Sequence, residues 1–258
     1  MNIVLLGSGN VATHLGRAFK MAGQTIDQVW SRDLEHAKQL ADTLASQAIF
    51  DIDDINRSAD LYIIAVKDSA ITELAKSLDL TDKLIVHTSG STSIDALIGV
   101  SDHIGVLYPL QTFSKNKAVD FRQIPIAIEA NNPDDLAAIR AIADRISEKV
   151  TELSSAQRKA LHVAAVFACN FTNHLFAVSQ NLLKEENLDF DLIRPLIAET
   201  AHKVQLYDPV SVQTGPAVRE DMEIINSHLE MLKDQPELQD LYKKLSQSIV
   251  NLHKHPQG

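Results

Sequence analysis

The chain has 258 residues, 45% of them hydrophobic, which is enough for one large domain or two smaller domains with ordinary buried cores. Its formal net charge of −10 argues against nucleic acid or an anionic membrane as the main partner, because both bind clusters of lysine and arginine. No apolar run reaches the length of a membrane span and the first residues already form a strand, so we expect a cytoplasmic protein.

An apolar strand, Ile3 to Leu6, runs directly into a glycine turn at the start of an amphipathic helix, Gly7-Ser8-Gly9-Asn10-Val11-Ala12. This pattern is typical of a dinucleotide-binding site: Gly7 permits the tight turn, Gly9 lets the backbone approach a pyrophosphate, and Ala12 lets helix and strand pack closely. The amides of Asn10 and Val11 lie at the helix N-terminus, where free N–H groups and the helix dipole favour an anion. A plain glycine turn is the alternative, but its place between strand and helix favours a cofactor.

The second strand, Thr25 to Trp30, ends at residues that distinguish NADP from NAD. An NAD site usually places a carboxylate at this end, where it bonds the ribose 2′-hydroxyl. Asp27 lies three residues before the end, about 10 Å short of the ligand at roughly 3.3 Å per residue, so it should miss the ribose. Ser31 and Arg32 follow the strand instead, and a hydroxyl with a guanidinium suits a 2′-phosphate. We therefore predict NADP, the alternative being an exposed loop arginine before a helix-capping Asp33.

Strands alternate with helices through about Val150, which predicts a mostly parallel sheet covered on both faces, the doubly wound Rossmann fold. After Ser154 the strand signals stop, so we place a Rossmann domain at 1–153 and an all-helical domain at 154–258. Further strands are expected near Ala48 to Phe50 and at Leu61 to Val66, Leu84 to His87, Ile104 to Tyr108 and Ile124 to Ile128. Helices are expected to start near Val11, Leu34, Ala70 and Thr92 and to span Pro133 to Ile146, Ala156 to Glu186, Asp191 to Leu206, Pro216 to Leu232 and Pro236 to His253.

Polar residues follow the fourth, fifth and sixth strands, with Tyr108 to Thr112 after the sixth, at the edge where ligands bind in open α/β sheets. Val66 can cover an apolar ring and Lys67 can reach an anion; with Thr88 and Ser89 they complete the predicted cofactor site. His87 could act as an acid or base, because imidazole titrates near neutral pH, or it could simply be tied to its own turn. The sequence leaves these two alternatives open.

The helix expected from Ala156 to Glu186 is apolar nearly all round in its first half, which predicts burial on most sides, with Cys169 as a small core residue. Four polar side chains interrupt this surface, and at about 100° per residue they fall within one third of the circumference. Their burial without partners would cost several kcal/mol, so the stripe faces a wet cleft or is fully hydrogen-bonded. We favour the cleft. His162 is then the candidate proton donor, Asn170 an anchor for a carbonyl or amine, and Asn173 and His174 further substrate contacts.

The sequence Thr214-Gly215-Pro216 is expected to open the next helix, with Pro216 at the first helical position and Thr214 near the cap. Arg219 could bind a substrate carboxylate or simply pair with Asp221, and the structural interpretation is slightly favoured. Thr214 and Arg219 are kept as candidate substrate-binding residues.

These motifs resemble those of known reductases. The glycine turn, Trp30-Ser31-Arg32 and the helical second half are similar to pyrroline-5-carboxylate reductases and β-hydroxyacid dehydrogenases. More closely, the chain resembles a bacterial NADP oxidoreductase family whose second half is a domain of unknown function. This resemblance covers essentially the whole chain and implies a Rossmann domain, a helical domain like that of 6-phosphogluconate dehydrogenase, and homodimers formed through the helices. It rests on His87 to Ser91, Tyr108 to Phe113, His162 to Asn170, and Thr214 to Pro216 with Arg219 and Asp221.

Two departures leave the substrate open. β-Hydroxyacid dehydrogenases carry a Lys-x-x-x-Asn pair on the long helix, but here Lys159 is followed four residues later by Val163. The loop at Thr214 also lacks the longer Thr-Ser-Pro-Gly-Gly-Thr sequence of the pyrroline reductases. We therefore predict an NADPH-dependent reductase of a small C=O or C=N compound held between the two domains, with no metal site. The alternative is a non-catalytic module that senses NADP(H).

Overall fold

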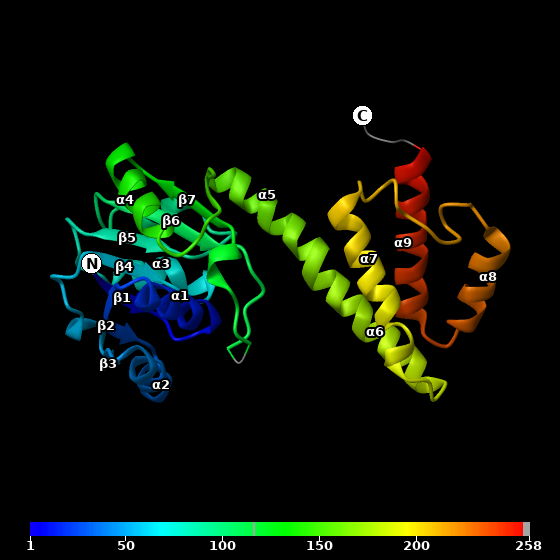
Figure 1. The fold of residues 1–258 in the computed structure, drawn as a ribbon, viewed down its shortest axis with the longest axis horizontal. Helices are drawn as coiled ribbons and strands as arrows, with labels where there is room; N and C mark the ends of the chain where they lie inside the picture. The colour runs from blue at the N-terminus through cyan, green and yellow to red at the C-terminus, as the bar shows by residue number, and fades with distance from the viewer. Residues whose placement is uncertain (116, 255–258) are drawn as a thin grey trace. The chain divides into compact units, whose positions relative to one another are not determined.

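The computed structural model describes residues 1–115 and 117–254, and the chain separates into two compact units, Met1–His174 and Leu175–Gly258. The first unit contains the sheet and its covering helices, and the second is helical (Figure 1). The last strand of the sheet ends at Glu152, next to the domain boundary that the sequence predicts. The helix that follows belongs to the first unit as far as His174.

The first unit is built on an eight-stranded sheet of order β3-β2-β1-β4-β5-β6-β7-β8. The first six strands run parallel, β7 is antiparallel to β6, and β8 is parallel to β7. This confirms the predicted Rossmann arrangement, in which the order reverses between β1 and β4. The three residues of β8 were not predicted as a strand. The strands are β1 (Asn2–Leu6), β2 (Thr25–Trp30), β3 (Gln47–Ile49), β4 (Leu61–Ile64), β5 (Leu84–His87), β6 (Ile104–Pro109), β7 (Ile126–Ala130) and β8 (Val150–Glu152).

Both faces of the sheet are buried, which explains the continuous apolar runs of its central strands. Side chains alternate between two hydrophobic clusters: Ile3 and Leu5 of β1 join one cluster, whereas Val4 and Leu6 join the other. The first cluster packs under α1 (Asn10–Met21), α2 (Leu34–Leu44) and α4 (Pro133–Ala143), and the second under α3 (Asp68–Lys76). The helix predicted near Thr92 is only a 3-10 turn, Ile94–Leu97, and Gly99 with its positive φ of 81° follows it closely.

The long helix is continuous, as predicted, but its middle is π-helical. It consists of α5 (Ser155–Ala165), the π segment η4 (Val166–Phe171) and α6 (Thr172–Glu185), and it begins with a capping box between Ser154 and Gln157.

The predicted burial of this helix is wrong. Val163, Phe167 and Phe171 are exposed, and so is Cys169, which the sequence analysis assigned to the core. The sequence pattern of this helix shows that its surface is apolar, but it does not show what covers that surface. By length and composition alone, Ser155–Glu185 could also cross a membrane, so the expectation that no segment has this property is wrong as well.

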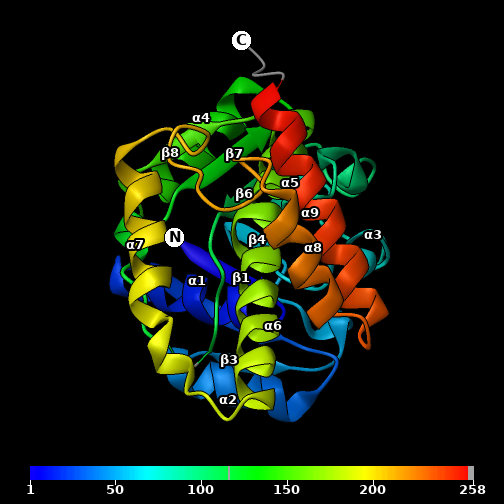
Figure 2. The same ribbon diagram turned by 90° about the vertical axis from the view of Figure 1, so that its right-hand side faces the viewer.

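The second unit contains the rest of α6 together with α7 (Arg194–Leu206), α8 (Met222–Met231) and α9 (Pro236–Lys254), all visible in Figure 2. The nitrogen Nδ1 of His228 on α8 and the hydroxyl of Tyr242 on α9 lie 2.8 Å apart and join these helices.

The predicted helix start at Pro216 is wrong, because α8 begins six residues later. The carboxylate of Asp221 accepts the Ile224 N–H and caps this helix. Before this helix, the Asp221 N–H donates to the Pro216 carbonyl at 3.0 Å. Glu220 has a left-handed φ of 50°, which a right-handed helix cannot contain. Pro216 is therefore not the first helical residue, and Thr214 caps no helix.

Candidate functional site

A cavity of about 470 Å³ lies at the carboxyl ends of β1, β2, β4 and β5. It is at the point where the strand order reverses, which is where open α/β sheets bind ligands. Nine of the predicted cofactor residues line it: Gly7, Gly9, Asn10, Val11, Ser31, Arg32, Val66, Lys67 and Thr88.

The two glycines of the turn serve different purposes. Gly7 has a φ of +136°, and a Cβ there would lie 2.3 Å from the carbonyl oxygen of Ala65, so only glycine fits. A Cβ on Gly9 would meet no atom within 4 Å and would project into open space. Gly9 is also the N-cap of α1, whose first turn has neither a side-chain cap nor an acidic residue. The free N–H groups at this helix end therefore fit a pyrophosphate.

The end of β2 offers a cation and two hydroxyls. Ser8 Oγ donates to Ser31 Oγ at 3.0 Å, and the exposed Arg32 forms no ion pair with any residue that the structure describes. Asp33 caps α2 by accepting the N–H groups of Glu35 and His36, which agrees with the alternative considered for that residue. Its carboxylate is therefore occupied with the helix, whereas the Arg32 guanidinium is available for a 2′-phosphate.

Asp27 does not line this cavity. Its carboxylate accepts a 2.6 Å hydrogen bond from the Asn56 side chain instead. Ala12 is fully buried in the core, where a larger residue would separate α1 from the sheet.

His87 is the last residue of β5 and Ser89 lies in the buried turn that follows; neither lines either cavity described in this section. The Ser89 hydroxyl accepts the N–H groups of Ser91 and Thr92, so it faces its own turn. His87 is fully buried, and its Nδ1 accepts the Ser89 N–H at 3.2 Å. The Nε2 atom of His87 has no hydrogen-bond partner in the described part of the chain.

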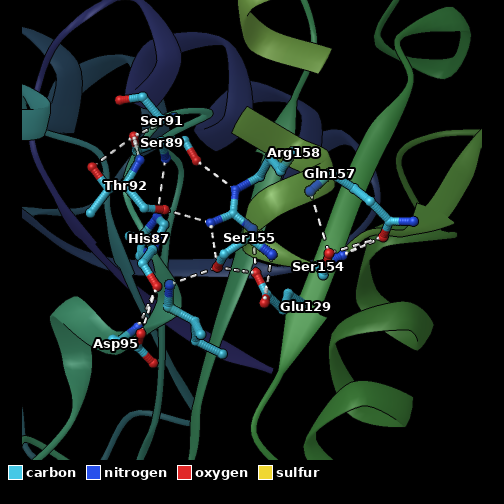
Figure 3. Close-up of polar contacts among 12 residues, drawn as sticks. His87, Ser89, Ser91, Thr92, Asp95, Glu129, Ser154, Ser155, Gln157 and Arg158 are labelled. Atoms are coloured by element: carbon cyan, nitrogen blue, oxygen red, sulfur yellow. Dashed lines mark hydrogen bonds and ion pairs between the residues drawn. The ribbon is translucent and has the colours of Figure 1, made fainter. Parts of the chain in front are cut away.

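The same turn is held by Arg158, a residue of α5 that is 1% exposed (Figure 3). Its guanidinium pairs with Glu129 of β7 and donates to the carbonyl oxygens of Ser89 and Thr92. Ser155 adds a second connection, because its N–H and hydroxyl both donate to Glu129 at 2.8 Å. The network fixes the start of α5 against the carboxyl edge of the sheet. It was missed in the sequence, where Arg158 and Glu129 are 29 residues apart and match no motif.

Burial, and to a lesser extent the positive charge of Arg158, lowers the pKa of His87 to about 4 from an ordinary value of about 6.5. Between these two values the unfolded chain binds a proton at residue 87 that the folded chain does not. The free energy of unfolding therefore falls as the pH falls through this window, by about 1.4 kcal/mol per unit from this residue alone.

Replacing His87 with asparagine, whose Oδ1 can still accept the Ser89 N–H, should remove this contribution. We expect the loss of unfolding free energy between pH 7 and pH 4.5 to be about 2–3 kcal/mol smaller in His87→Asn than in the wild type. Urea unfolding followed by the fluorescence of Trp30, the single tryptophan of the chain, measures it. Parallel losses in the two proteins would contradict the assigned pKa.

A second cavity, of about 670 Å³, lies between the segment that follows β6 and the α5–η4 helix. His162 and Asn170, both predicted site residues, line it together with Tyr108, Gln111 and Thr112. The other predicted residues of the helix stripe, Asn173 and His174, are exposed and do not line it. The wall from Val166 to Asn170 is π-helical, and π segments within α-helices occur frequently at functional sites.

Tyr108 also lines this cavity; the sequence analysis noted it after the sixth strand but assigned it no role. Its hydroxyl lies 3.1 Å from Nδ1 of His162, and its ring and hydroxyl pack against Gly90. Thr214 and Arg219 lie in the second unit, and both side chains are exposed.

The segment that lines the second cavity is attached to α1. The Asn10 side chain donates to the carbonyl oxygen of Phe113 at 2.8 Å, and His14 Nε2 lies 2.9 Å from that of Ser114. His14 also stacks on Phe113 with ring centroids 4.9 Å apart. Asn10 thus belongs to the glycine turn and also fixes a wall of the second cavity.

Two family models match the chain. The model described as NADP oxidoreductase, coenzyme F420-dependent, matches residues 2–90, and that of a domain of unknown function, DUF2520, matches residues 124–249. No curated protein sequence matches at a significant level.

Solved structures resemble the chain over nearly its whole length. A Bacteroides fragilis protein described as a putative NADP oxidoreductase is 47% identical, with a TM-score of 0.91 over 97% of this chain and 98% of that one. A 1-pyrroline-5-carboxylate reductase from Streptococcus pyogenes is 15% identical, with a TM-score of 0.64 over 98% and 99%. An imine reductase from Myxococcus stipitatus in complex with NADP+ is 16% identical, with a TM-score of 0.66 over 99% and 93%. The last two likenesses show the fold alone.

Proposed function

The chain belongs to the family of the Bacteroides fragilis NADP oxidoreductase, and on that premise we propose that it reduces the C=O or C=N group of a small compound. NADP is the cofactor of the family, and its reduced form supplies a hydride when bound. The residues of this chain then have to bind the dinucleotide, hold the substrate beside it and supply a proton.

One observation carries the proposal: a single turn contacts residues of both cavities. Thr88 lines the cavity around the glycine turn, and Gly90, two residues later, packs against Tyr108 and His162 of the second cavity. A dinucleotide on the first cavity would therefore end beside polar groups that can orient a substrate. The second cavity combines these groups with apolar residues such as Leu110 and Val166, which suits a small organic molecule.

Arg32 should decide between the two nicotinamide dinucleotides. In Arg32→Ala, the 2′-phosphate loses a charged partner worth about 1.5–3 kcal/mol. We therefore expect the dissociation constant of NADPH to rise about 10–100-fold and that of NADH to change less than about twofold. Titration calorimetry measures both constants, with Arg57→Ala as a control because Arg57 pairs with Asp79 away from the cavity. Equal losses of affinity for the two cofactors would contradict the assignment.

The reductase itself is tested by NADPH oxidation against a panel of small ketoacids, aldehydes and cyclic imines. Turnover of any member, reduced when His162 is replaced by alanine while folding and NADPH affinity are retained, supports the proposal. Tight NADPH binding without turnover on any member would instead favour a non-catalytic module that senses NADP(H).

We also propose that the protein is a cytoplasmic homodimer joined through its helices. Val163, Phe167 and Phe171 lie exposed on the long helix, and a second copy would remove them from water. The helix carries His162 and Asn170 and is anchored at its start by the Arg158 network, which favours a protein partner over lipid. Light scattering should give twice the mass of a single chain, and the protein should not sediment with lipid vesicles.

A further inference from the structure

The hydroxyl of Tyr108 and the imidazole of His162 form a pair at one end of the second cavity. Tyr108 comes from the carboxyl end of β6 and His162 from the second turn of α5, and Oη and Nδ1 lie 3.1 Å apart. Their rings meet edge to face, with centroids 6.2 Å apart. Two groups that can exchange a proton are therefore in hydrogen-bond contact where a substrate can reach them.

Gly90 sets the distance between this pair and the cofactor cavity. It is buried, and a Cβ on it would lie 2.7 Å from His162 Nδ1 and 2.8 Å from the Tyr108 hydroxyl. Any other residue would push the pair away from the turn that carries Thr88. The phenol is thus held against the same short segment that forms part of the cofactor cavity.

Other candidate acids near this turn are less well placed. His87 is fully buried, and its pKa of about 4 leaves it neutral at physiological pH. Asp68 lines the cofactor cavity, but its carboxylate accepts a hydrogen bond from Ser91. Burial raises the pKa of Tyr108, and the nearby Asp68 carboxylate adds to this effect while Arg158 opposes it. The phenol therefore keeps its proton at neutral pH and can donate it.

We propose that Tyr108 is the proton donor of the reduction and that His162 restores its proton. This inference rests on the proposed reductase function. The hydride adds to the carbonyl or imine carbon with its electron pair, and the π pair of the double bond moves to the oxygen or nitrogen. That atom takes the proton of Tyr108 Oη as the O–H bond breaks. The phenolate then takes the Nδ1 proton of the partly exposed His162 while its Nε2 takes a proton from water, so the ring stays neutral and hydroxide passes to the solvent.

The test compares two tyrosines that each lose one hydroxyl. In Tyr108→Phe we expect kcat to fall at least about 100-fold, because general acid catalysis contributes about 10²–10⁴-fold. The dissociation constant of NADPH should change less than about threefold. Tyr62→Phe is the control, since the hydroxyl of Tyr62 donates to the Asn56 carbonyl and lines neither cavity. Its kcat should match the wild type.

A second measurement needs neither cofactor nor turnover. Carbon-13 labelling of tyrosine Cζ gives one NMR signal for each of the four tyrosines, and the signal missing in Tyr108→Phe belongs to Tyr108. In His162→Gln this signal should shift while those of the other tyrosines stay in place. His162→Gln should also lower kcat about tenfold, less than Tyr108→Phe does, because water can still return a proton to the phenolate.

The possible failures are distinguishable. A wild-type protein that reduces no compound of the panel overturns the reductase function and the donor role with it. A wild type that turns over, beside a Tyr108→Phe variant of equal kcat, overturns the donor role alone. A Tyr108 signal that does not respond to His162→Gln overturns the proton relay between the two residues.

Discussion

Replacing Arg158 with methionine is expected to lower the free energy of unfolding of the first unit by about 3–5 kcal/mol. Methionine nearly preserves the length of the side chain, so the main change is the loss of a buried cation. It leaves Glu129 without its charge partner and the carbonyl oxygens of Ser89 and Thr92 without a donor. The loss of a charge partner by Glu129 and of a donor by each carbonyl oxygen accounts for most of this cost.

Trp30 makes the effect measurable, because it lies in the first unit and is 8% exposed. Chemical unfolding of the full chain, followed by its fluorescence, gives the unfolding free energy. Arg122→Met is the matched control, since it removes an arginine from a pair with Glu148 in which both side chains are more than half exposed. Water screens such a pair, so we expect little change.

A double variant separates the ion pair from simple loss of packing. Adding Glu129→Leu to Arg158→Met removes the stranded carboxylate, so the double variant should be more stable than the sum of its two single changes predicts. Additive losses, or a cost for Arg158→Met no larger than that of Arg122→Met, would show that the network does not hold α5 to the sheet.

Most of the Rossmann fold could be predicted from sequence because its signals are local. Strand β1 is apolar on both faces because both faces are buried, Gly7 lies in the tight turn, and Ala12 packs in the core, as the motif predicts. The three residues of β8 give too short a pattern to detect. At Pro216 the local pattern gave a wrong helix start. Proline suits a first helical turn, but Glu220 is left-handed and Asp221 caps the helix, which therefore begins at Met222.

The site was only partly predictable, because its decisive contacts join residues far apart in the chain. Tyr108 and His162 are 54 residues apart, and the pairing of β6 with β7 and the contact of Arg158 with Glu129 bring the end of β6 next to the start of α5. Helical periodicity placed His162 and Asn170 on one face but could not exclude Asn173 and His174, which the π segment and the end of the cavity leave outside. The exposed Phe167 shows the same limit, since a sequence does not identify what covers an apolar face.

Gly9→Ala is expected to abolish most NADPH binding while leaving the fold intact. The added methyl group would meet no protein atom within 4 Å, and the φ of −78° at Gly9 is one that alanine adopts readily. Alanine is a poorer N-cap than glycine, so a loss of about 1 kcal/mol in unfolding free energy is expected. The methyl group would project into the space where the backbone must approach a pyrophosphate, and we expect the dissociation constant of NADPH to rise about 100-fold, or about 2.8 kcal/mol.

Gly7→Ala in the same turn should behave in the opposite way. Its Cβ would lie 2.3 Å from the Ala65 carbonyl oxygen, and the φ of +136° is closed to alanine, so the turn itself must move. We expect a loss of about 4 kcal/mol or more in unfolding free energy, since a steric clash adds to a strained backbone. Unfolding by Trp30 fluorescence and NADPH titration on both variants distinguish the two glycines. A cofactor bound against this turn would clash with the added methyl group. If Gly9→Ala binds NADPH as the wild type does, the cofactor therefore does not lie against this turn.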